Sequence, residues 1–215
     1  MAEERSLRER LIDVGADLVL TEGTASVGLR EIARRAGVSH GAPRRHFPTH
    51  QALLSAIARR GFDDLGARFA AATAAVPAPR DRLAALARAY VGYARERRGM
   101  FELMFRHDLL DGGQREEAGQ PPLRASTLPL FRRIVELVEL CRAESADAAR
   151  RGGPGGTPVP PETTAAALWA NLHGIVQLAA WGSLGLALGD LPQGGDHVDR
   201  LVSAALDAHL GPVVP

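Results

Sequence analysis

The chain has 215 residues, of which 46% are hydrophobic and 24% charged, a balance that excludes collagen-like, coiled-coil and wholly disordered proteins. Its 26 basic residues, all arginine, stand against 25 acidic ones, so the net charge of +1 neither favours nor excludes nucleic-acid binding. The single cysteine, Cys141, excludes an intrachain disulfide and a zinc site built from cysteines.

Strand signals are almost absent, which predicts an all-α protein of about nine helices. Ala, Leu, Arg and Glu recur at spacings of three and four, whereas β-branched and aromatic residues are sparse. The N-terminal residues alternate in charge, and the longest apolar run elsewhere, residues 165–170, is far too short to cross a membrane. We therefore expect a soluble cytoplasmic protein with no membrane partner.

Four helices are expected before residue 77. Ser6, with Glu9 three residues on, forms a capping box that begins the first, and Gly23 ends it. Pro48 ends the third, and Thr49 caps the fourth. These helices are predicted at residues 6–21, 29–36, 39–47 and 50–76.

Five more helices follow, at residues 80–98, 100–110, 123–150, 162–188 and 196–210. Pro129 is expected to disturb the third of these five, and loops rich in glycine and proline are expected at residues 112–122 and 152–161. Nine of the ten aromatic residues lie beyond residue 60, so a second core is expected there. We predict two domains, residues 1–60 and residues 61–215.

Positive charge is concentrated near the N-terminus. Residues 23–60 contain seven arginines and one acid, Glu31, a local balance of +6. A compact basic segment in a near-neutral protein is what contact with DNA phosphates requires. A solvated basic face explains the charge equally well, so the helical pattern must decide between the two.

That pattern is a helix-turn-helix. Ala33 is small enough for two helices to cross closely, and Gly37 can adopt positive φ in the turn. Val38 supplies an apolar side chain that can be buried between the helices, and Ser39 can act as the N-cap of the next helix. Double-stranded DNA is therefore the expected partner.

The helix after the turn has two distinct faces. Pro43 and Phe47 point inward at helical spacing, and Pro43 is expected to distort the start of the helix. Small residues and the arginines Arg44 and Arg45 point outward, where a guanidinium group can bind guanine O6 and N7 or a phosphate.

At this point the chain resembles the N-terminal domain of the tetracycline-repressor (TetR) family of transcriptional regulators. The matching segments are LREIARRAGVS at residues 29–39 and GAPRRHFPTHQALL at residues 41–54, and the resemblance covers about residues 6–60. It implies a homodimer on a palindromic operator, with repression as the default role. The implied DNA contacts are Arg30, Ser39, His40, Gly41, Ala42, Arg44, Arg45, His46 and Thr49.

Within that set we expect Arg44 and Arg45 to read the groove, and Arg30, His46 and Thr49 to contact the backbone. Two alternatives stay open: Arg45 is an exposed arginine with no partner, or His46 packs at a hinge. The sequence also departs from many relatives. It has Gly28 where they have a hydroxyl residue, Arg44 and Arg45 where they have aromatics, and His50 or Gln51 where they have lysine.

The second domain carries the motif LWANLHG at residues 168–174, which places Trp169 and His173 one turn apart on a helix face. It is similar to the Trp-His-Gly signature of one C-terminal subfamily of these regulators. A small-molecule effector pocket is expected near Tyr90 and Asn171, with the core as the alternative location for these side chains. Its expected lining is Tyr93, Phe101, Phe105, Phe131, Trp169, His173 and Gln177.

The resemblance also implies that the last two helices pair with those of a second copy. Small and apolar residues there suit such packing, although the same residues could instead close the chain's own core. The expected dimer contacts are Ala165, Leu168, Leu172, Ile175, Leu201, Leu206 and Leu210.

Other functions are less well supported by the sequence. It has no glycine-rich phosphate loop, nucleophile elbow or HExxH motif, and His197 and His209 alone do not make a metal site. We expect no enzymatic activity, cofactor or metal, and we expect Cys141 in the core. The alternative function is a helical DNA-binding protein without small-molecule control, architectural or regulated by a protein partner.

Overall fold

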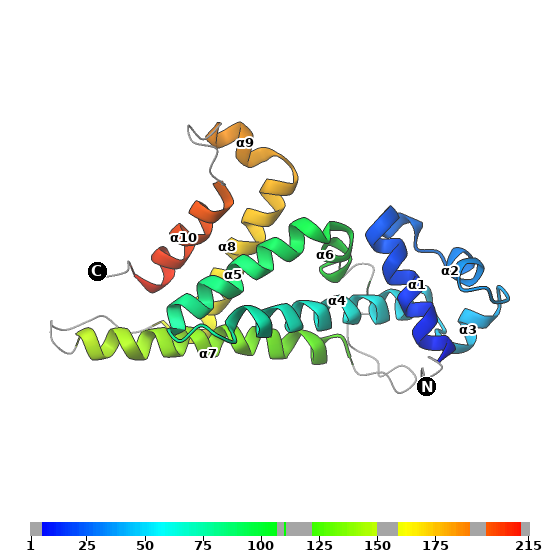
Figure 1. Ribbon diagram of the computed structural model, residues 1–215, viewed down its shortest axis with the longest axis horizontal. Helices are drawn as coiled ribbons and strands as arrows, with labels where there is room; N and C mark the ends of the chain where they lie inside the picture. Colours follow the sequence, from blue (N-terminus) through cyan, green and yellow to red (C-terminus); the bar gives the residue numbers. More distant parts are fainter. Residues whose placement is uncertain (1–5, 107–109, 111–121, 150–158, 190–196, 212–215) are drawn as a thin grey trace. The chain divides into compact units, whose positions relative to one another are not determined.

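The computed structural model describes residues 6–106, 110, 122–149, 159–189 and 197–211, and within them it holds ten α-helices, one 3-10 helix and no strand (Figure 1). The all-α prediction is confirmed. The elements are α1 (Leu7–Glu22), η1 (Thr24–Ser26), α2 (Leu29–Arg35), α3 (Ala42–His46), α4 (His50–Thr73), α5 (Pro79–Glu96), α6 (Arg98–Met104), α7 (Arg124–Ala149), α8 (Pro161–Ala180), α9 (Ser183–Leu188) and α10 (His197–Leu210). The loops expected at residues 112–122 and 152–161 lie almost wholly outside the described residues.

Local capping signals set the ends of α1 and the start of α4, as predicted. The Ser6 hydroxyl accepts the Glu9 N–H at 3.3 Å, and the Glu9 carboxylate accepts the Ser6 N–H at 3.3 Å. Gly23 ends α1 with φ +82°, a conformation that costs glycine little. The Thr49 hydroxyl accepts the Ala52 N–H at 3.0 Å and so satisfies a free donor at the start of α4.

Several helix predictions differ from the structure. The helix predicted at residues 100–110 is α6, which begins at Arg98 and ends at Met104. The third helix spans only Ala42–His46, because residues 39–41 form a turn. The helix predicted at residues 162–188 is divided into α8 and α9 at Gly182, whose φ of +74° does not continue an α-helix. Pro129, expected to disturb its helix, lies inside an unbroken α7. It is exposed, so water can replace the missing backbone hydrogen bond.

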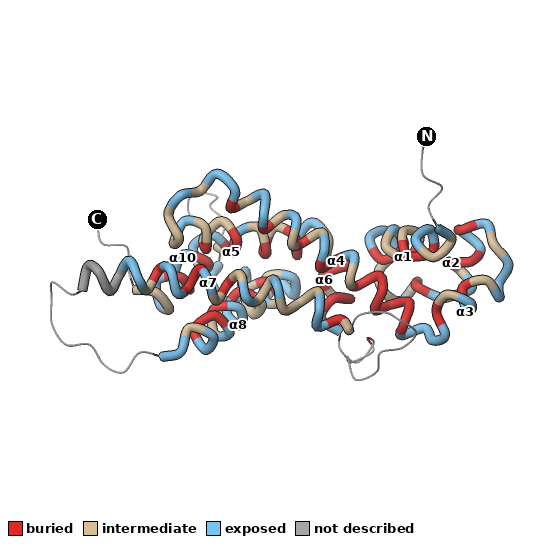
Figure 2. The backbone as a smooth tube through the Cα atoms, turned by 90° about the horizontal axis from the view of Figure 1, so that it is seen from below, coloured by how far each residue is buried: buried red, intermediate tan, exposed pale blue. Residues whose placement is uncertain are grey.

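The chain divides into two compact units, the first made of Met1–Gly66 and Glu96–Leu128. In this unit α1 packs against α2, α3, η1 and α6. Figure 2 shows its buried residues in red on α1 and on the first part of α4. The side chains that fill its core are Leu11, Leu18, Val19, Ile32, Phe47, Leu53, Ile57, Leu103 and Met104, all at most 1% exposed.

Helix α6 approaches α1 and α4 closely at two glycines, and at one of them a backbone atom leaves no room for a Cβ. A Cβ on Gly99 would lie 2.3 Å from the carbonyl oxygen of Val19, a contact no real Cβ makes. A Cβ on Gly61 of α4 would lie 2.7 Å from the Met104 sulfur and 2.9 Å from the Met100 sulfur. Thus α6, distant in sequence from the first helices, belongs to the same unit.

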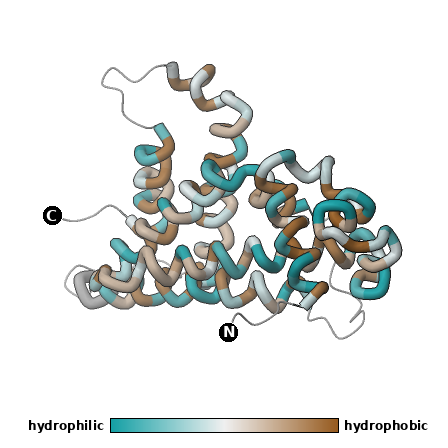
Figure 3. The backbone as a smooth tube through the Cα atoms, turned by 45° about the vertical axis from the view of Figure 1, so that its right-hand side comes forward, coloured by the Kyte–Doolittle hydropathy of each residue, from teal (hydrophilic) through white to brown (hydrophobic). Residues whose placement is uncertain are grey.

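The second unit is made of Ala67–Arg95 and Pro129–Pro215. Here α10 and α9 pack against α8. Figure 3 shows hydrophobic and hydrophilic residues alternating along the helices, as amphipathic helices require. Its core includes Leu83, Leu86, Tyr93, Leu137, Val138, Ala165, Leu168 and Val202. The domain boundary expected at residue 60 falls within α4, six residues before the end of the first segment of the N-terminal unit.

Two features are absent from the described residues. No helix among them is both long enough and apolar enough to cross a membrane. No group of three or more His, Cys, Asp or Glu side chains in the same residues could hold a metal ion.

Candidate nucleic-acid interface

The turn between α2 and α3 has the geometry that its sequence predicts. Gly37 has φ +68°, and the Val38 N–H donates to the carbonyl of Ala33 at 3.0 Å. Ala33 is fully buried where the helices cross. Ser39, however, does not cap α3: the N-cap is Gly41, which makes no side-chain hydrogen bond.

Helix α3 is short and starts irregularly, as expected from its proline. The Ala42 N–H donates to the Ser39 carbonyl at 2.9 Å, a three-residue turn that precedes the α-helix. Pro43 and Phe47 are both buried, whereas residues 39–41 are exposed, as the pale blue of this segment shows in Figure 2. The inward and outward faces predicted for this helix are therefore confirmed.

The structure leaves the expected DNA contacts at the surface. His46 and Ala42 are partly buried. Thr49 is exposed, but its oxygen already accepts the cap bond at the start of α4. The exposed members of the set are Arg30, Ser39, His40, Gly41, Arg44, Arg45 and Thr49.

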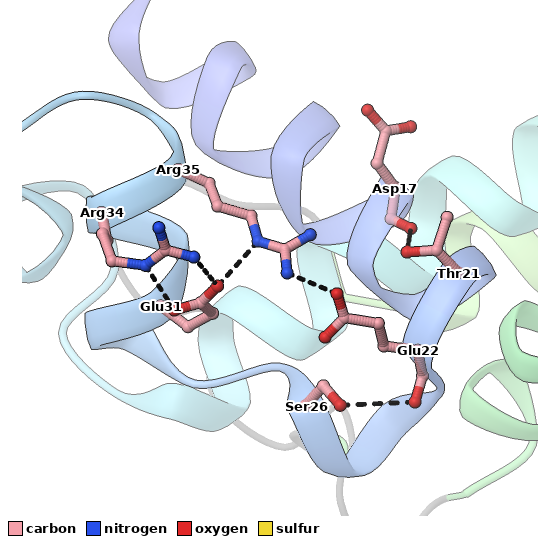
Figure 4. A network of polar contacts seen from close by, with 7 residues as sticks. All are labelled: Asp17, Thr21, Glu22, Ser26, Glu31, Arg34 and Arg35. Atoms are coloured by element: carbon pink, nitrogen blue, oxygen red, sulfur yellow. Dashed lines mark hydrogen bonds and ion pairs between the residues drawn. The ribbon is translucent and has the colours of Figure 1, made fainter.

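Two arginines of α2 are held by acidic side chains (Figure 4). Arg34 donates from Nε and a terminal nitrogen to the two oxygens of Glu31, at 2.9 and 2.5 Å. Arg35 donates to Glu31 at 2.7 Å and also binds Glu22 of α1. These hydrogen bonds, from Arg34 first and Arg35 second, lower the pKa of Glu31 to about 2.

Four of the five remaining arginines of the basic segment fall into two groups. Arg60 pairs with Asp13 of α1 at 2.7 Å. Across the described part of the chain, no carboxylate lies within ion-pairing distance of Arg30, Arg44 or Arg45. The positive charge left for an external anion is therefore concentrated on α2 and α3.

The second unit contains a hydrogen-bonded group of polar and aromatic side chains. The Tyr90 hydroxyl lies 2.8 Å from His173 Nδ1, and Trp169 Nε1 donates to the same hydroxyl at 3.2 Å. His173 Nε2 lies 3.3 Å from the Gln177 amide. The rings of Trp169 and His173 are 6.2 Å apart, which confirms that they share a helix face.

Burial shifts the pKa of two members of this group, His173 and Tyr90. Burial lowers the pKa of His173. Burial also raises the pKa of Tyr90, a shift that the hydrogen bond from Trp169 partly opposes. Asn171 was expected beside this group, but its Nδ2 lies 2.7 Å from Nε2 of His209 on α10.

The other aromatic residues expected in the effector pocket do not all join this group. Phe101 and Phe105 belong to the N-terminal unit, where Phe105 contacts Phe62 with ring centroids 5.8 Å apart. Tyr93 is fully buried beneath the guanidinium of Arg68, at 5.1 Å. Phe131 lies partly buried on α7.

Sequence comparison decides the family. Residues 11–57 match the family profile described as "Bacterial regulatory proteins, tetR family". Residues 83–208, more than half of the chain, match the profile described as "Tetracyclin repressor-like, C-terminal domain". The chain belongs to the TetR family. Comparison with curated proteins gives no match.

Solved structures resemble this chain over nearly its whole length. A protein of unknown function from Rhodococcus sp. RHA1 is 33% identical, with a TM-score of 0.69, over 97% of this chain and 96% of that one. The multidrug binding protein EbrR, complexed with imidazole, is 26% identical, with a TM-score of 0.58, over 99% and 98%. A TetR family regulator from Thermus thermophilus, PfmR, is 19% identical, with a TM-score of 0.57 over 96% and 100%, a likeness of fold alone.

The dimer contacts expected for this TetR family member differ in their exposure. Ala165, Leu168, Leu172 and Leu206 are at most 4% exposed in the single chain, so they contribute to the core of the C-terminal unit. Their small and apolar character reflects packing of α8 against α10. The other three expected contacts, Ile175, Leu201 and Leu210, are partly exposed.

The single chain leaves an apolar surface open around α9, and this surface was not expected from the sequence. Trp181 is 68% exposed and Leu186 is 91% exposed, and α9 has no buried residue at all. Leu178 and Leu188 are also exposed. One signal could have found this surface: residues 163–189 contain no aspartate, glutamate or arginine.

Proposed function

We propose that this TetR family member is a repressor that binds a palindromic operator as a homodimer and is released by a small-molecule effector. The observation that carries the DNA-binding part is the contrast among the arginines of the basic segment. Arg34 and Arg35 are neutralised by acids, whereas Arg44 and Arg45 stand exposed on α3 without a carboxylate partner among the described residues. Unpaired arginines on a recognition helix suit guanine edges and phosphates.

Selection of binding sites from random duplex DNA tests the proposal directly. A recovered palindrome, with affinity that falls steeply as salt rises, supports a dimeric sequence-specific regulator. Tight, salt-sensitive binding without a motif would favour the architectural alternative. No binding at any salt concentration would contradict DNA regulation altogether.

Substitutions of matched arginines sharpen this test. Arg44→Ala and Arg45→Ala should each weaken operator binding by about 1–3 kcal/mol if the side chain contacts a base. Arg34→Ala should cost less, because its charge is already balanced by Glu31. Equal losses in all three variants would show that ion pairing within the chain does not decide which arginines bind DNA.

The effector part of the proposal rests on the C-terminal unit. Tyr90, Trp169, His173 and Gln177 combine aromatic surface with a few ordered polar groups, which is typical of small-molecule sites. The neighbour EbrR, by its description a multidrug binding protein seen with imidazole, supports ligand control of this chain by analogy. A ligand that binds the DNA-released form more tightly than the DNA-bound form lowers operator affinity. The factor by which it does so equals the ratio of its affinities for the two forms.

Fluorescence provides the corresponding measurement. Trp169 lies within the group, whereas Trp181 is largely exposed, so a Trp181→Phe variant isolates the first signal. A compound that both saturates this signal and releases the operator would be the effector. If no compound in a library changes the fluorescence signal or the operator affinity, the result counts against ligand control. It would favour a DNA-binding protein without small-molecule control.

Homodimerisation is proposed through the exposed apolar residues of α8 and α9. A six-residue helix with no buried residue gains little from its own chain, and isolated helices this short are unstable in water. A second copy that covers Trp181 and Leu186 would supply the missing burial.

Light scattering at micromolar concentration measures this association. The wild-type protein should be a dimer, and Leu186→Glu should shift it to monomer because a carboxylate would be buried. Leu140→Glu on α7, a second exposed leucine, is the matched control and should stay dimeric. A monomeric wild-type protein would remove both the dimer and the palindromic operator.

A further inference from the structure

One arginine outside the helix-turn-helix lies against it. The guanidinium carbon of Arg8, in the first turn of α1, lies 5.4 Å from the centre of the Phe47 ring. Phe47 directly follows α3 and is fully buried. Arg8 therefore helps to cover this ring and places its charge beside the C-terminal end of the recognition helix.

Arg8 has no acidic partner among the described residues. In the ranges that the structure describes, no carboxylate lies within ion-pairing distance of Arg8. Asp13, on the same helix, is instead paired with Arg60. Arg8 is partly exposed, so its full charge remains accessible from solvent.

A second arginine lies near it. Arg59 of α4 is half-buried, and its pKa is lowered first by that burial and then by the positive charge of Arg8. Asp63 acts on Arg59 in the opposite direction. Positive charge is thus gathered at this end of the N-terminal unit, and a nearby anion would interact favourably with it.

We propose that Arg8 binds a DNA backbone phosphate at the edge of the major groove occupied by α3. This inference rests on the proposed DNA-binding function and extends its interface to α1. Helix α3 has five residues and is about 7.5 Å long. The major groove is about 12 Å wide, so a cation just beyond the end of α3 meets the phosphates rather than the bases.

Cover of Phe47 alone does not account for an arginine here. A cation over a phenylalanine ring at a partly exposed site contributes little to stability. A leucine or methionine would cover the ring without placing a second positive charge near Arg59. The phosphate contact explains both the position and the charge of Arg8.

Salt dependence of DNA binding by the full chain tests this role. The probes are the selected operator duplex and a mixed-sequence duplex of equal length. Arg8→Gln and Arg8→Met should weaken binding to both duplexes by the same factor and lower the slope of log K against log salt by about 0.9 for each phosphate that the protein no longer neutralises. Arg8→Lys should retain most of the slope. Arg88→Gln, which removes one exposed charge from α5, is the control and should leave the slope unchanged.

Stability measurements separate a phosphate contact from a purely structural role. Arg8→Met keeps an apolar side chain over Phe47, so its Tm should stay close to the wild-type value while its slope falls. An unchanged slope in Arg8→Met, or an affinity loss that follows a lower Tm without a change in slope, would overturn the proposal. If Arg44→Ala and Arg45→Ala also leave binding unchanged, the DNA-binding proposal itself fails.

Discussion

The Tyr90 hydroxyl is shared between two nitrogen partners. Trp169 Nε1 donates to its oxygen at 3.2 Å, and His173 Nδ1 lies 2.8 Å away. On the other side of the imidazole, the Gln177 amide nitrogen lies 3.3 Å from His173 Nε2. An amide nitrogen only donates, so the imidazole needs an unprotonated nitrogen, and a neutral His173 fits these contacts.

This arrangement predicts that the C-terminal unit loses stability in mild acid. Burial lowers the pKa of His173 in the folded chain below its ordinary value of 6.5. The unfolded chain then binds the proton first, so the contribution of His173 is complete above pH 6.5 and is lost as the pH falls through the folded pKa. Protonation would also leave the imidazole without an acceptor, which the Gln177 amide nitrogen beside Nε2 requires.

Thermal unfolding at pH 7.5 and pH 5.5 measures the effect. The wild-type Tm should fall more between these pH values than the Tm of His173→Asn, which retains an acceptor but cannot titrate. His40→Asn, at an exposed histidine, is the control and should behave like the wild type. An equal fall in the wild type and His173→Asn would show that His173 is not held neutral.

A second prediction ranks glycine substitutions in the N-terminal unit. Gly99→Ala places a Cβ 2.3 Å from the rigid backbone oxygen of Val19, so we expect a loss of stability at or above the upper end of the usual overpacking cost of about 1–3 kcal/mol. Gly61→Ala meets only the flexible side chains of Met100 and Met104 and should cost less.

Gly41 provides the control for this series. Its φ of −84° suits alanine, and a Cβ there would have no atom within 4 Å in the described residues. Gly41→Ala should therefore leave the midpoint of denaturant unfolding almost unchanged. If Gly61→Ala destabilises as much as Gly99→Ala, the methionines do not adapt and the proposed difference between backbone and side-chain contacts is wrong.

The sequence predicted best those features that depend on neighbours in the chain. The capping box at Ser6, the Thr49 cap and the positive φ of Gly37 each depend on residues within a few positions, and each is found. The faces of α3 also follow from helical spacing alone. The length of α3 was overestimated and Ser39 was wrongly expected to cap it, because a turn replaces its expected first residues.

Features that depend on distant residues were not predictable in the same way. The hydrogen bond of Arg35 to Glu22, thirteen residues earlier, needs the packing of α2 against α1. The burial of Ala165 and Leu168 likewise requires knowledge of which face of α8 meets α10. Periodicity identifies an apolar face but not whether its partner belongs to the same chain or to a second copy.

A third prediction concerns Cys141, which lies in the core as expected, 5% exposed. Burial, with a smaller contribution from Glu144, raises the pKa of its thiol to about 11, so the reactive thiolate is scarce at neutral pH. Iodoacetamide at pH 8 should modify the native protein far more slowly than the unfolded chain. Diamide should leave operator affinity unchanged, and rapid labelling of the native protein would contradict a core position.

The fourth prediction concerns acid and the helix-turn-helix. Hydrogen bonds from Arg34 and Arg35 lower the folded pKa of Glu31 from 4.5 to about 2. Because the folded pKa is the lower one, the stabilisation is complete above pH 4.5 and is lost as the pH falls from 4.5 toward 2. An NMR titration of the Glu31 carboxylate should give a midpoint near 2, and a midpoint at 4.5 would mean that the two arginines do not hold it in solution.

Glu31→Gln gives an independent measurement of the same ion pairs at neutral pH. Removing the carboxylate releases Arg34 entirely and leaves Arg35 only its bond to Glu22, so the charge on α2 becomes available to phosphates. Binding to mixed-sequence DNA should then depend more steeply on salt than in the wild type. Asp207→Asn removes an acid paired with Arg80 in the C-terminal unit and should leave the slope unchanged. If Glu31→Gln also leaves it unchanged, Arg34 and Arg35 do not face DNA, and the basic surface is confined to Arg30 and the arginines of α3.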